Sequence, residues 1–242
     1  MDANSRLTLA SSSALDTVRG RIRAAAERAQ RDPDSVRLIA VTKGVETSRI
    51  AAALAAGVTD VGENRVQEAE TKRAEVMDMP GVAAASLCWH MLGHVQRNKA
   101  RRVATSFDWV HSVDSLILAE KLSQERPPTE PPLRVLIEVE LTGLPGRSGV
   151  APSGLAALVT PVQSLSHIQV TGLMAIAAPA PDPEVARPTF ARLRRLRDAA
   201  QESSGVALPE LSMGMSDDFE VAIEEGATLV RIGRAIFGPR MV

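Results

Sequence analysis

Short apolar runs alternate along this chain with longer stretches of helical spacing, and this alternation constrains the fold most. A strand followed by a helix and then another strand belongs in a parallel sheet. Eight such units in about 200 residues match the smallest (β/α)8 barrels, so we expect an α/β protein built as one TIM barrel. An open doubly wound sheet is the alternative. The eight runs are VRLIAVTK (36–43), TDVGE (59–63), LCWHMLG (87–93), FDWVHSV (107–113), LRVLIEVEL (133–141), IQVTGLMAI (168–176), LPELSMG (208–214) and TLVRIG (228–233).

The segments around these runs predict a single domain with one extra N-terminal helix. ALDTVRGRIRAAAERAQRD (14–32) has helical spacing and precedes the first strand. Asp114 is expected to cap the helix in SLILAEKLSQE. The proline-rich pieces ERPPTEPP and APAPDPEVARP indicate loops. Because no change in composition marks a second domain, we predict one domain over 1–242.

Charge and cysteine content exclude several classes of protein. Lysine and arginine total 28 against 29 acidic residues, a formal charge of −1. This balance favours neither nucleic acid nor an anionic membrane surface, so we expect neither partner. The single cysteine, Cys88, cannot form an internal disulfide, which suits a reducing compartment. The apolar runs fall short of the roughly 18 residues that span a bilayer, and we read no export signal, so we expect a cytoplasmic protein.

A barrel places its chemistry in the loops at the carboxyl ends of its strands. His90 and His111 lie inside strand patterns, where we expect hydrogen-bonded core residues, and no spacing indicates a metal site. The residues expected at the mouth are Lys43, Glu63, Asn64, His94, Met174, Gly233 and Arg234, together with the GMSDD turn at 214–218.

The last two strands end in signals that are typical of a phosphate site. Gly214 permits a close backbone approach, and Ser216 lies before a helix expected to start near 218. Gly233 and Arg234 follow the eighth strand at a second helix start. Barrels often bind phosphate between these two loops, where helix amides are exposed. Each motif alone is most simply a turn and a cap, but the pair favours phosphate.

A lysine opposite a phosphate site indicates carbonyl capture, because a neutral amine attacks an aldehyde or ketone carbon. Two ligand classes fit Lys43: pyridoxal phosphate, or a sugar phosphate in a Schiff-base aldolase. Alternation in LVRIG directs Arg231 into the barrel, an expensive place for a charge without a partner. A pyridine nitrogen is one possible partner. An ion pair with Glu138 or Glu140 is the purely structural alternative.

These motifs together resemble the pyridoxal phosphate homeostasis protein family, whose fold is similar to the N-terminal barrel of alanine racemase. The resemblance covers nearly the whole chain and implies that Lys43 forms an aldimine with pyridoxal phosphate. It also implies that Met215, Ser216, Gly233 and Arg234 surround the phosphate, that Arg231 faces the pyridine nitrogen, and that Asn64 and Met174 lie beside the ring. The matching motifs are AVTKGV (40–45), GENRVQE (62–68), WHMLGHVQRNK (89–99), HSVDS (111–115), TGLMAI (171–176), LSMGMSDDFEVAI (211–223) and VRIGRAIFG (230–238).

Three positions depart from the family pattern. Arg65 stands where a tyrosine is usual, and Arg147 where a lysine is common. Arg234 replaces a threonine or serine whose hydroxyl usually reaches the phosphate. A guanidinium can also bind phosphate, with a different reach.

The resemblance implies a carrier of pyridoxal phosphate in cofactor homeostasis rather than an enzyme. Racemisation needs an acid-base group on each face of the cofactor, and the chain contains no tyrosine to supply the second. An amino-acid racemase, with His94 as the second base, and an aldolase remain the alternatives. We expect a monomer that passes its cofactor to pyridoxal phosphate-dependent apoenzymes in transient contacts.

Overall fold

Eight parallel strands close into a barrel in the computed structural model, which describes residues 3–79 and 87–239. The strands follow one another around the barrel in sequence order, and β8 pairs with β1, so the expected barrel is confirmed and the open sheet is wrong. Each strand is shorter than its apolar run because the run ends belong to loops. The strands are β1 (Arg37–Val41), β2 (Asp60–Glu63), β3 (Cys88–Met91), β4 (Trp109–Val113), β5 (Leu133–Glu138), β6 (Ile168–Met174), β7 (Glu210–Ser212) and β8 (Leu229–Ile232).

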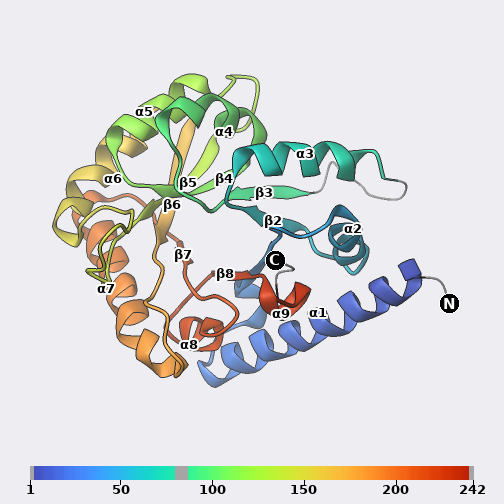
Figure 1. Ribbon diagram of the computed structural model, residues 1–242. Helices are drawn as coiled ribbons and strands as arrows, with labels where there is room; N and C mark the ends of the chain where they lie inside the picture. Colours follow the sequence, from blue (N-terminus) through green and yellow to red (C-terminus); the bar gives the residue numbers. More distant parts are fainter. Residues whose placement is uncertain (1–2, 80–86, 240–242) are drawn as a thin grey trace.

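Helices surround the barrel on its outside (Figure 1). None in the described part of the chain is both long and apolar enough to cross a bilayer. The α-helices are α1 (Ala3–Arg28), α2 (Thr47–Ala55), α3 (Val66–Met77), α4 (Ala100–Ser106), α5 (Leu116–Glu125), α6 (Leu155–Gln163), α7 (Arg187–Ser204), α8 (Phe219–Glu224) and α9 (Arg234–Phe237). Short 3-10 turns are η1 (Pro33–Ser35), η3 (Arg97–Lys99), η4 (Pro152–Gly154) and η5 (Pro183–Ala186).

The extra N-terminal helix α1 begins earlier than the sequence indicated and packs against α2, α8 and α9 (Figure 1). Arg19 donates to the carbonyls of Ala56 and Gly57 at 3.0 and 2.8 Å, where α2 ends. On its other side, Arg21 pairs with Glu220 of α8 at 3.0 Å. Helix α1 therefore joins the first and last units of the barrel.

The apolar core has two parts. One lies between the strands and the helices, where outward-facing Val135 and Ile137 of β5 pack with α5 and α6 residues such as Leu122 and Val159. The other fills the barrel interior and consists of Ile39, Trp109, Leu136, Met174 and Leu229. Alternation along the strands sends neighbouring side chains to these two sides. The interior also holds polar side chains, which determine the site described below.

One expected cap is wrong. Ser115, not Asp114, is the N-cap of α5, and its hydroxyl accepts from the Leu118 amide at 3.4 Å. The carboxylate of Asp114 lies 3.3 Å from His94 Nδ1 instead. Both residue types cap helices well, so the sequence could not choose between neighbours.

We predict that Gly172→Ala destabilises the barrel. A Cβ at this position in β6 would lie 1.9 Å from the carbonyl oxygen of Glu210 in β7, so the two strands would have to separate. We expect a loss of about 1–3 kcal/mol in the free energy of unfolding, measured by chemical denaturation. Gly20→Ala is the matched control, because a Cβ there meets nothing within 4 Å on exposed α1. Equal stabilities for the two variants would contradict the prediction.

Candidate functional site

A cavity of about 440 Å³ opens at the carboxyl ends of the strands, within the size range of small-molecule sites. It is lined by all eight residues that the sequence predicted for cofactor binding: Lys43, Asn64, Met174, Met215, Ser216, Arg231, Gly233 and Arg234. Glu63 and His94, also expected at the mouth, are not among its lining residues. The structure thus brings the predicted set together, and their roles toward a ligand stay predictions.

Lys43 follows β1 in a loop that is fixed on both sides. The hydroxyl of Thr42 donates to Glu63 Oε1 at 2.6 Å, and the Gly44 amide donates to Glu68 Oε1 at 2.6 Å. Lys72 joins the two carboxylates, with Nζ 2.8 Å from Glu63 Oε1 and 2.6 Å from Glu68 Oε1. It also donates to the Thr42 carbonyl oxygen. Lys72, Glu63 and Glu68 therefore hold the backbone before and after Lys43.

Glu63 lies behind this loop and not in the mouth. Its side chain is fully buried between β2 and α3, where Lys72 reaches it. Burial raises the pKa of Glu63, and the hydrogen bonds from Lys72 and Thr42 oppose that shift. The second carboxylate oxygen has no hydrogen-bond partner within the described residues. Glu63 is absent from the mouth because alternation sends this last residue of β2 outward, toward the helices.

The two loops predicted to hold phosphate lie side by side. The Ala235 amide donates to Ser216 Oγ at 3.3 Å, and Arg234 pairs with Asp217 across the loops. Gly214 has φ +91°, and a Cβ there would lie 2.9 Å from Phe219 Cα, so only glycine fits. The side chain of Arg234 is 62% exposed. Its guanidinium is therefore available at the cavity edge and already has one acidic neighbour.

Arg231 lies inside the barrel as alternation predicted. Its Nη1 donates to Ser212 Oγ at 2.6 Å, and its Nη2 donates to the Ala175 carbonyl at 3.1 Å. No carboxylate of the described residues is within ion-pair distance, so the structural alternative of an ion pair with Glu138 or Glu140 is wrong. Burial lowers the pKa of Arg231 to about 10, and the charges of Asp218 and Glu138 oppose this shift. A buried cation with neutral partners therefore lines the cavity.

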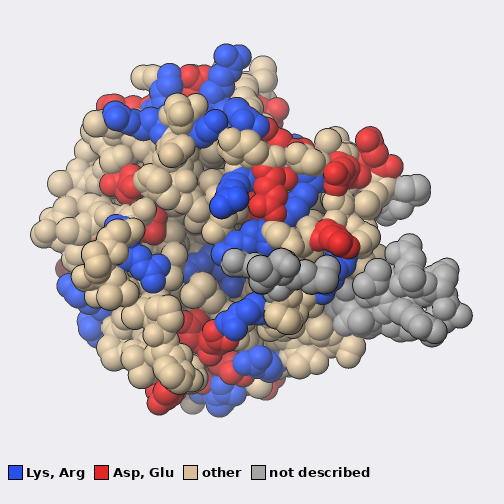
Figure 2. Space-filling model, viewed as in Figure 1, with Lys and Arg blue, Asp and Glu red and all other residues tan. Residues whose placement is uncertain are grey.

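The lining of the cavity favours an anionic ligand. Its ionisable members are Lys43, Arg49, Arg231 and Arg234 on the basic side and Glu46 and Asp217 on the acidic side. Basic side chains gather around the centre of the face shown in Figure 2. Cations around a concave site attract and hold an anion such as a phosphate.

His94, the weakest of the expected residues, lies apart from the cavity lining. Half of its side chain is exposed, and its Nδ1 is 3.3 Å from Asp114 Oδ2. The chain folds tightly at this point, because Gly93 packs against the backbone of Asn64 so closely that a Cβ would meet the Asn64 carbonyl oxygen at 2.2 Å. This contact fixes Asn64 at the mouth while His94 turns toward Asp114.

Sequence reasoning missed two residues that support the site. Lys72 carries one signal, its spacing of four from Glu68 on α3, which is typical of a helical ion pair. Ser212 carries another, because it follows the apolar Leu211, and alternation in β7 sends the two side chains to opposite faces. Neither signal shows which residue is the partner in space. The contact of Lys72 with Thr42 and that of Ser212 with Arg231 therefore could not be predicted.

Comparison with known proteins identifies similar chains. The model of the alanine racemase N-terminal domain matches residues 13–241. A pyridoxal phosphate homeostasis protein of Pseudomonas aeruginosa is 47% identical over 223 residues, which are 92% of this chain and 93% of that protein. PipY of Synechococcus elongatus, solved with pyridoxal phosphate (PLP) bound, has a TM-score of 0.78 at 41% identity over 90% of this chain and 99% of its own. Alanine racemase of Corynebacterium glutamicum shares the fold, with a TM-score of 0.67 at 19% identity over 93% of this chain and 62% of its own.

We predict that Lys72→Met destabilises the protein by about 3 kcal/mol, because it leaves the buried Glu63 carboxylate without its cation. Chemical denaturation measures this loss. Lys121→Met is the matched control, since Lys121 pairs with Glu125 on the surface of α5 at 2.7 Å and such pairs contribute less than about 1 kcal/mol. Similar losses in both variants would show that the Glu63 carboxylate does not depend on Lys72.

We predict a pH-dependent stability contribution from Glu138. Burial, followed by the charge of Asp114, raises the pKa of Glu138 to about 7, against an ordinary value of 4.5. The folded protein therefore binds a proton that the unfolded chain releases, and stability falls as pH rises through this window. Relative to Glu138→Gln, the wild type should lose about 1–3 kcal/mol of unfolding free energy between pH 4.5 and pH 7. A constant difference across denaturation curves in that range would contradict it.

Proposed function

Since this chain belongs to the pyridoxal phosphate homeostasis protein family, and with it to the wider family of the alanine racemase N-terminal domain, we propose that it binds PLP and serves in PLP homeostasis. The observation that carries the proposal is Arg231, a buried guanidinium at the cavity whose protein partners are neutral. Such a donor suits a ligand atom with a lone pair, and the pyridine nitrogen of PLP is one.

We propose that the cofactor is held covalently, as an aldimine of Lys43. The lysine follows β1 on the same cavity as Arg231 and the two loops with phosphate signals. Ser216 would bind the phosphate with nearby backbone amides, and Arg234 would add its charge from the rim. Gly233 supports this fit, because a Cβ there would lie 3.3 Å from the Val41 carbonyl and narrow the space beside β1. Asn64 and Met174 would line the ring, and Met215 the phosphate end.

The bound group would supply a reactive aldehyde, and the chain's own residues favour storage of it over catalysis. Arg231 donates hydrogens only, so it would keep a ring nitrogen unprotonated and weaken the ring as an electron sink. The tyrosine that would act as the second base of a racemase is absent from the sequence, and His94 pairs with Asp114 outside the cavity lining. A racemase would need that base opposite Lys43.

We propose that the protein acts in the cytoplasm as a monomer and passes PLP to apoenzymes in transient contacts. The exposed cavity supports transfer, since its lining includes loop residues such as Met215 and Asp217 that face solvent. Lys43 would hold the aldehyde carbon of the cofactor reversibly, so that hydrolysis of the bond to its nitrogen could return both the aldehyde and the free amine. The loop geometry around Lys43 would hold that amine in place for the next cofactor.

We predict that purified protein incubated with PLP gains a visible absorbance, and that borohydride reduction adds the mass of the cofactor to Lys43. Lys43→Ala should show neither the absorbance nor the added mass. Lys121→Ala is the control, because Lys121 lies on α5 with its amine paired to Glu125. Absorbance spectroscopy and peptide mass spectrometry are the measurements. A wild-type protein that remains colourless and carries no mass on Lys43 would overturn the proposal.

The same loaded protein separates a carrier from an enzyme. We expect no turnover when it is incubated with single L- and D-amino acids and the products are resolved by chiral chromatography. Racemisation that disappears in Lys43→Ala would replace the carrier with an enzyme while leaving PLP binding intact.

A further inference from the structure

A chain of hydrogen bonds crosses the barrel interior from Arg231 to the opposite end. Arg231 Nη1 lies 2.6 Å from Ser212 Oγ, which lies 2.8 Å from His111 Nδ1. His111 Nε2 is 3.0 Å from His90 Nδ1. His90 Nε2 is 3.0 Å from Asp60 Oδ1, at the start of β2. All five side chains are buried. The expected core role of the two histidines is thus confirmed, and they form a continuous path.

The hydrogens of this path have one self-consistent arrangement when both imidazoles are neutral. Asp60 accepts, so His90 donates from Nε2 and its Nδ1 becomes an acceptor. His111 must then donate from Nε2 to His90, which leaves His111 Nδ1 as an acceptor. Ser212 donates its hydroxyl hydrogen to that nitrogen, and its oxygen accepts from Arg231. Every hydrogen therefore points from the cation toward the carboxylate.

Burial supports this neutral arrangement. It lowers the pKa of His90, although the hydrogen bond to Asp60 opposes the shift. It also holds the pKa of His111 well below its ordinary value, with the charges of His90 and Arg231 acting in the same direction. Burial alone would raise the pKa of Asp60, but hydrogen bonds from His90 and Thr59 hold it below its ordinary value. Near neutral pH the path therefore joins a guanidinium to a carboxylate through two neutral rings.

Packing against aromatic neighbours also holds the imidazole rings of His90 and His111 in place. His90 stacks on Trp109 with 5.5 Å between ring centroids and meets His111 edge-on at 5.2 Å. Trp109 is in turn covered by the guanidinium groups of Arg37 and Arg134, at 5.7 and 5.2 Å from its ring. These contacts restrict rotation of the imidazoles, so the hydrogen-bonded order can persist.

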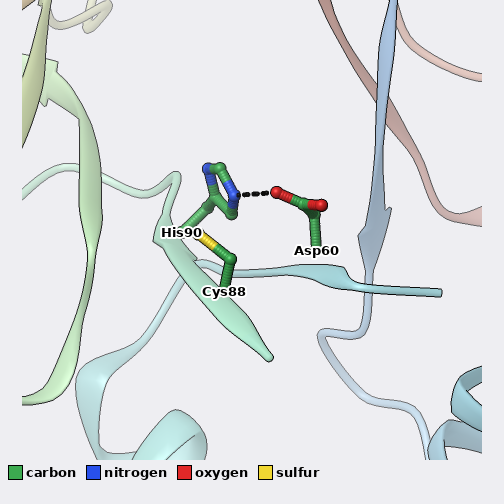
Figure 3. A group of neighbouring side chains, drawn as sticks. All are labelled: Asp60, Cys88 and His90. Carbon is green, nitrogen blue, oxygen red and sulfur yellow. Dashed lines mark hydrogen bonds and ion pairs between the residues drawn. The ribbon is translucent and has the colours of Figure 1, made fainter. Parts of the chain in front are cut away.

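The Asp60 end could instead be read as a metal site, because ligand atoms of Asp60, Cys88 and His90 lie within 4.8 Å of one another (Figure 3). The hydrogen bonds favour a different use. Figure 3 shows the His90 ring directed at the Asp60 carboxylate, whose other oxygen accepts from Thr59 at 2.7 Å. The guanidinium of Arg37 lies 3.4 Å from the same carboxylate and would repel a metal cation bound there. Burial raises the pKa of the Cys88 thiol to about 12, which disfavours the thiolate form.

We propose that Ser212, His111, His90 and Asp60 are positioning residues that keep Arg231 aimed at the cavity as a hydrogen donor. Because Ser212 gives its hydrogen to His111, it always turns an oxygen lone pair to the guanidinium. The hydrogen bond to Ser212 fixes Nη1 of Arg231, and the hydrogen bond to the Ala175 carbonyl fixes Nη2. Among the residues of this path, only Arg231 then offers hydrogens to a ligand's ring nitrogen. This inference rests on the proposed function, since the ligand in question is PLP.

The first test reads the hydrogens directly in the cofactor-free protein. Long-range ¹H–¹⁵N NMR spectra distinguish imidazole tautomers, and we expect both His90 and His111 to be neutral with the proton on Nε2 near neutral pH. A proton on Nδ1 of either ring would overturn the inference. His167, a half-buried residue just before β6, provides an internal reference signal. The measurement needs no variant and no bound PLP.

The second test removes the Ser212 hydroxyl, which is the hydrogen-bond partner of Arg231 in this path. Ser212→Ala should raise the dissociation constant for PLP roughly tenfold, because a hydrogen bond that orients a charged group is lost. It should also move the ¹⁵N signal of the ring nitrogen in labelled PLP, and Ser212→Thr, which keeps the hydroxyl, should restore it. Ser112→Ala is the matched control, since this buried hydroxyl donates to the Gly93 carbonyl at 2.7 Å, outside the path.

The outcomes separate the two proposals. Wild-type affinity and an unchanged ring-nitrogen signal in Ser212→Ala would overturn the positioning role while PLP binding stands. Failure of the wild type to bind PLP would overturn the proposed function, and the tautomer spectra would still decide the path. If Ser212→Ala does not fold, Asp60→Asn tests the other end, and an unchanged ring-nitrogen signal there would also count against the inference.

Discussion

Pairing of β8 with β1 is the constraint on which the rest of the structure depends. It sets Ile39 beside Arg231 and Ala40 beside Ile232, so the loops that follow the two strands leave the barrel next to each other. Lys43 and the Gly233–Arg234 turn are almost two hundred residues apart in sequence, yet they border one cavity for this reason. No local interaction could bring them together. The site therefore exists only in the closed barrel, because strand pairing sets where each side chain lies.

Closure also creates a buried interior in which charge must be balanced. Arg231 keeps its positive charge at neutral pH, and the nearest hydrogen-bond acceptors are neutral. The charges of Asp218 and Glu138 act on Arg231 without forming an ion pair, and polarised hydrogen bonds lead from it to Asp60 at the other end of the interior. Direct pairing would have neutralised the guanidinium and turned it away from the cavity. With neutral hydrogen-bond partners, the guanidinium can lie inside the barrel and still face a ligand.

Much of the fold was predictable because it rests on local periodicity. The strands, the extra helix and the inward direction of Arg231 all follow from alternation or helical spacing. The mouth was predictable for the same reason, since the loops that follow parallel strands gather at one end of a barrel. Glu63 and His94 show the limit, because one turns outward to Lys72 and the other pairs with Asp114. Partners across the barrel, such as Ser212 and His111, depend on strand register and tilt, which a single sequence does not encode visibly.

Helix α1 has a consequence for the order of events during synthesis. Its apolar residues Leu15, Val18 and Ile22 are buried in the folded protein, and its neighbours α8 and α9 are synthesised after the other helices of the described chain. Until residues 219–237 appear, β1 lacks its closing partner β8, and α1 lacks its contacts with α8 and α9. The nascent chain must carry this helix with part of its apolar side uncovered, a state in which a chaperone has something to bind. Only when the last of these helices has been made can α1 bury the whole of its apolar side.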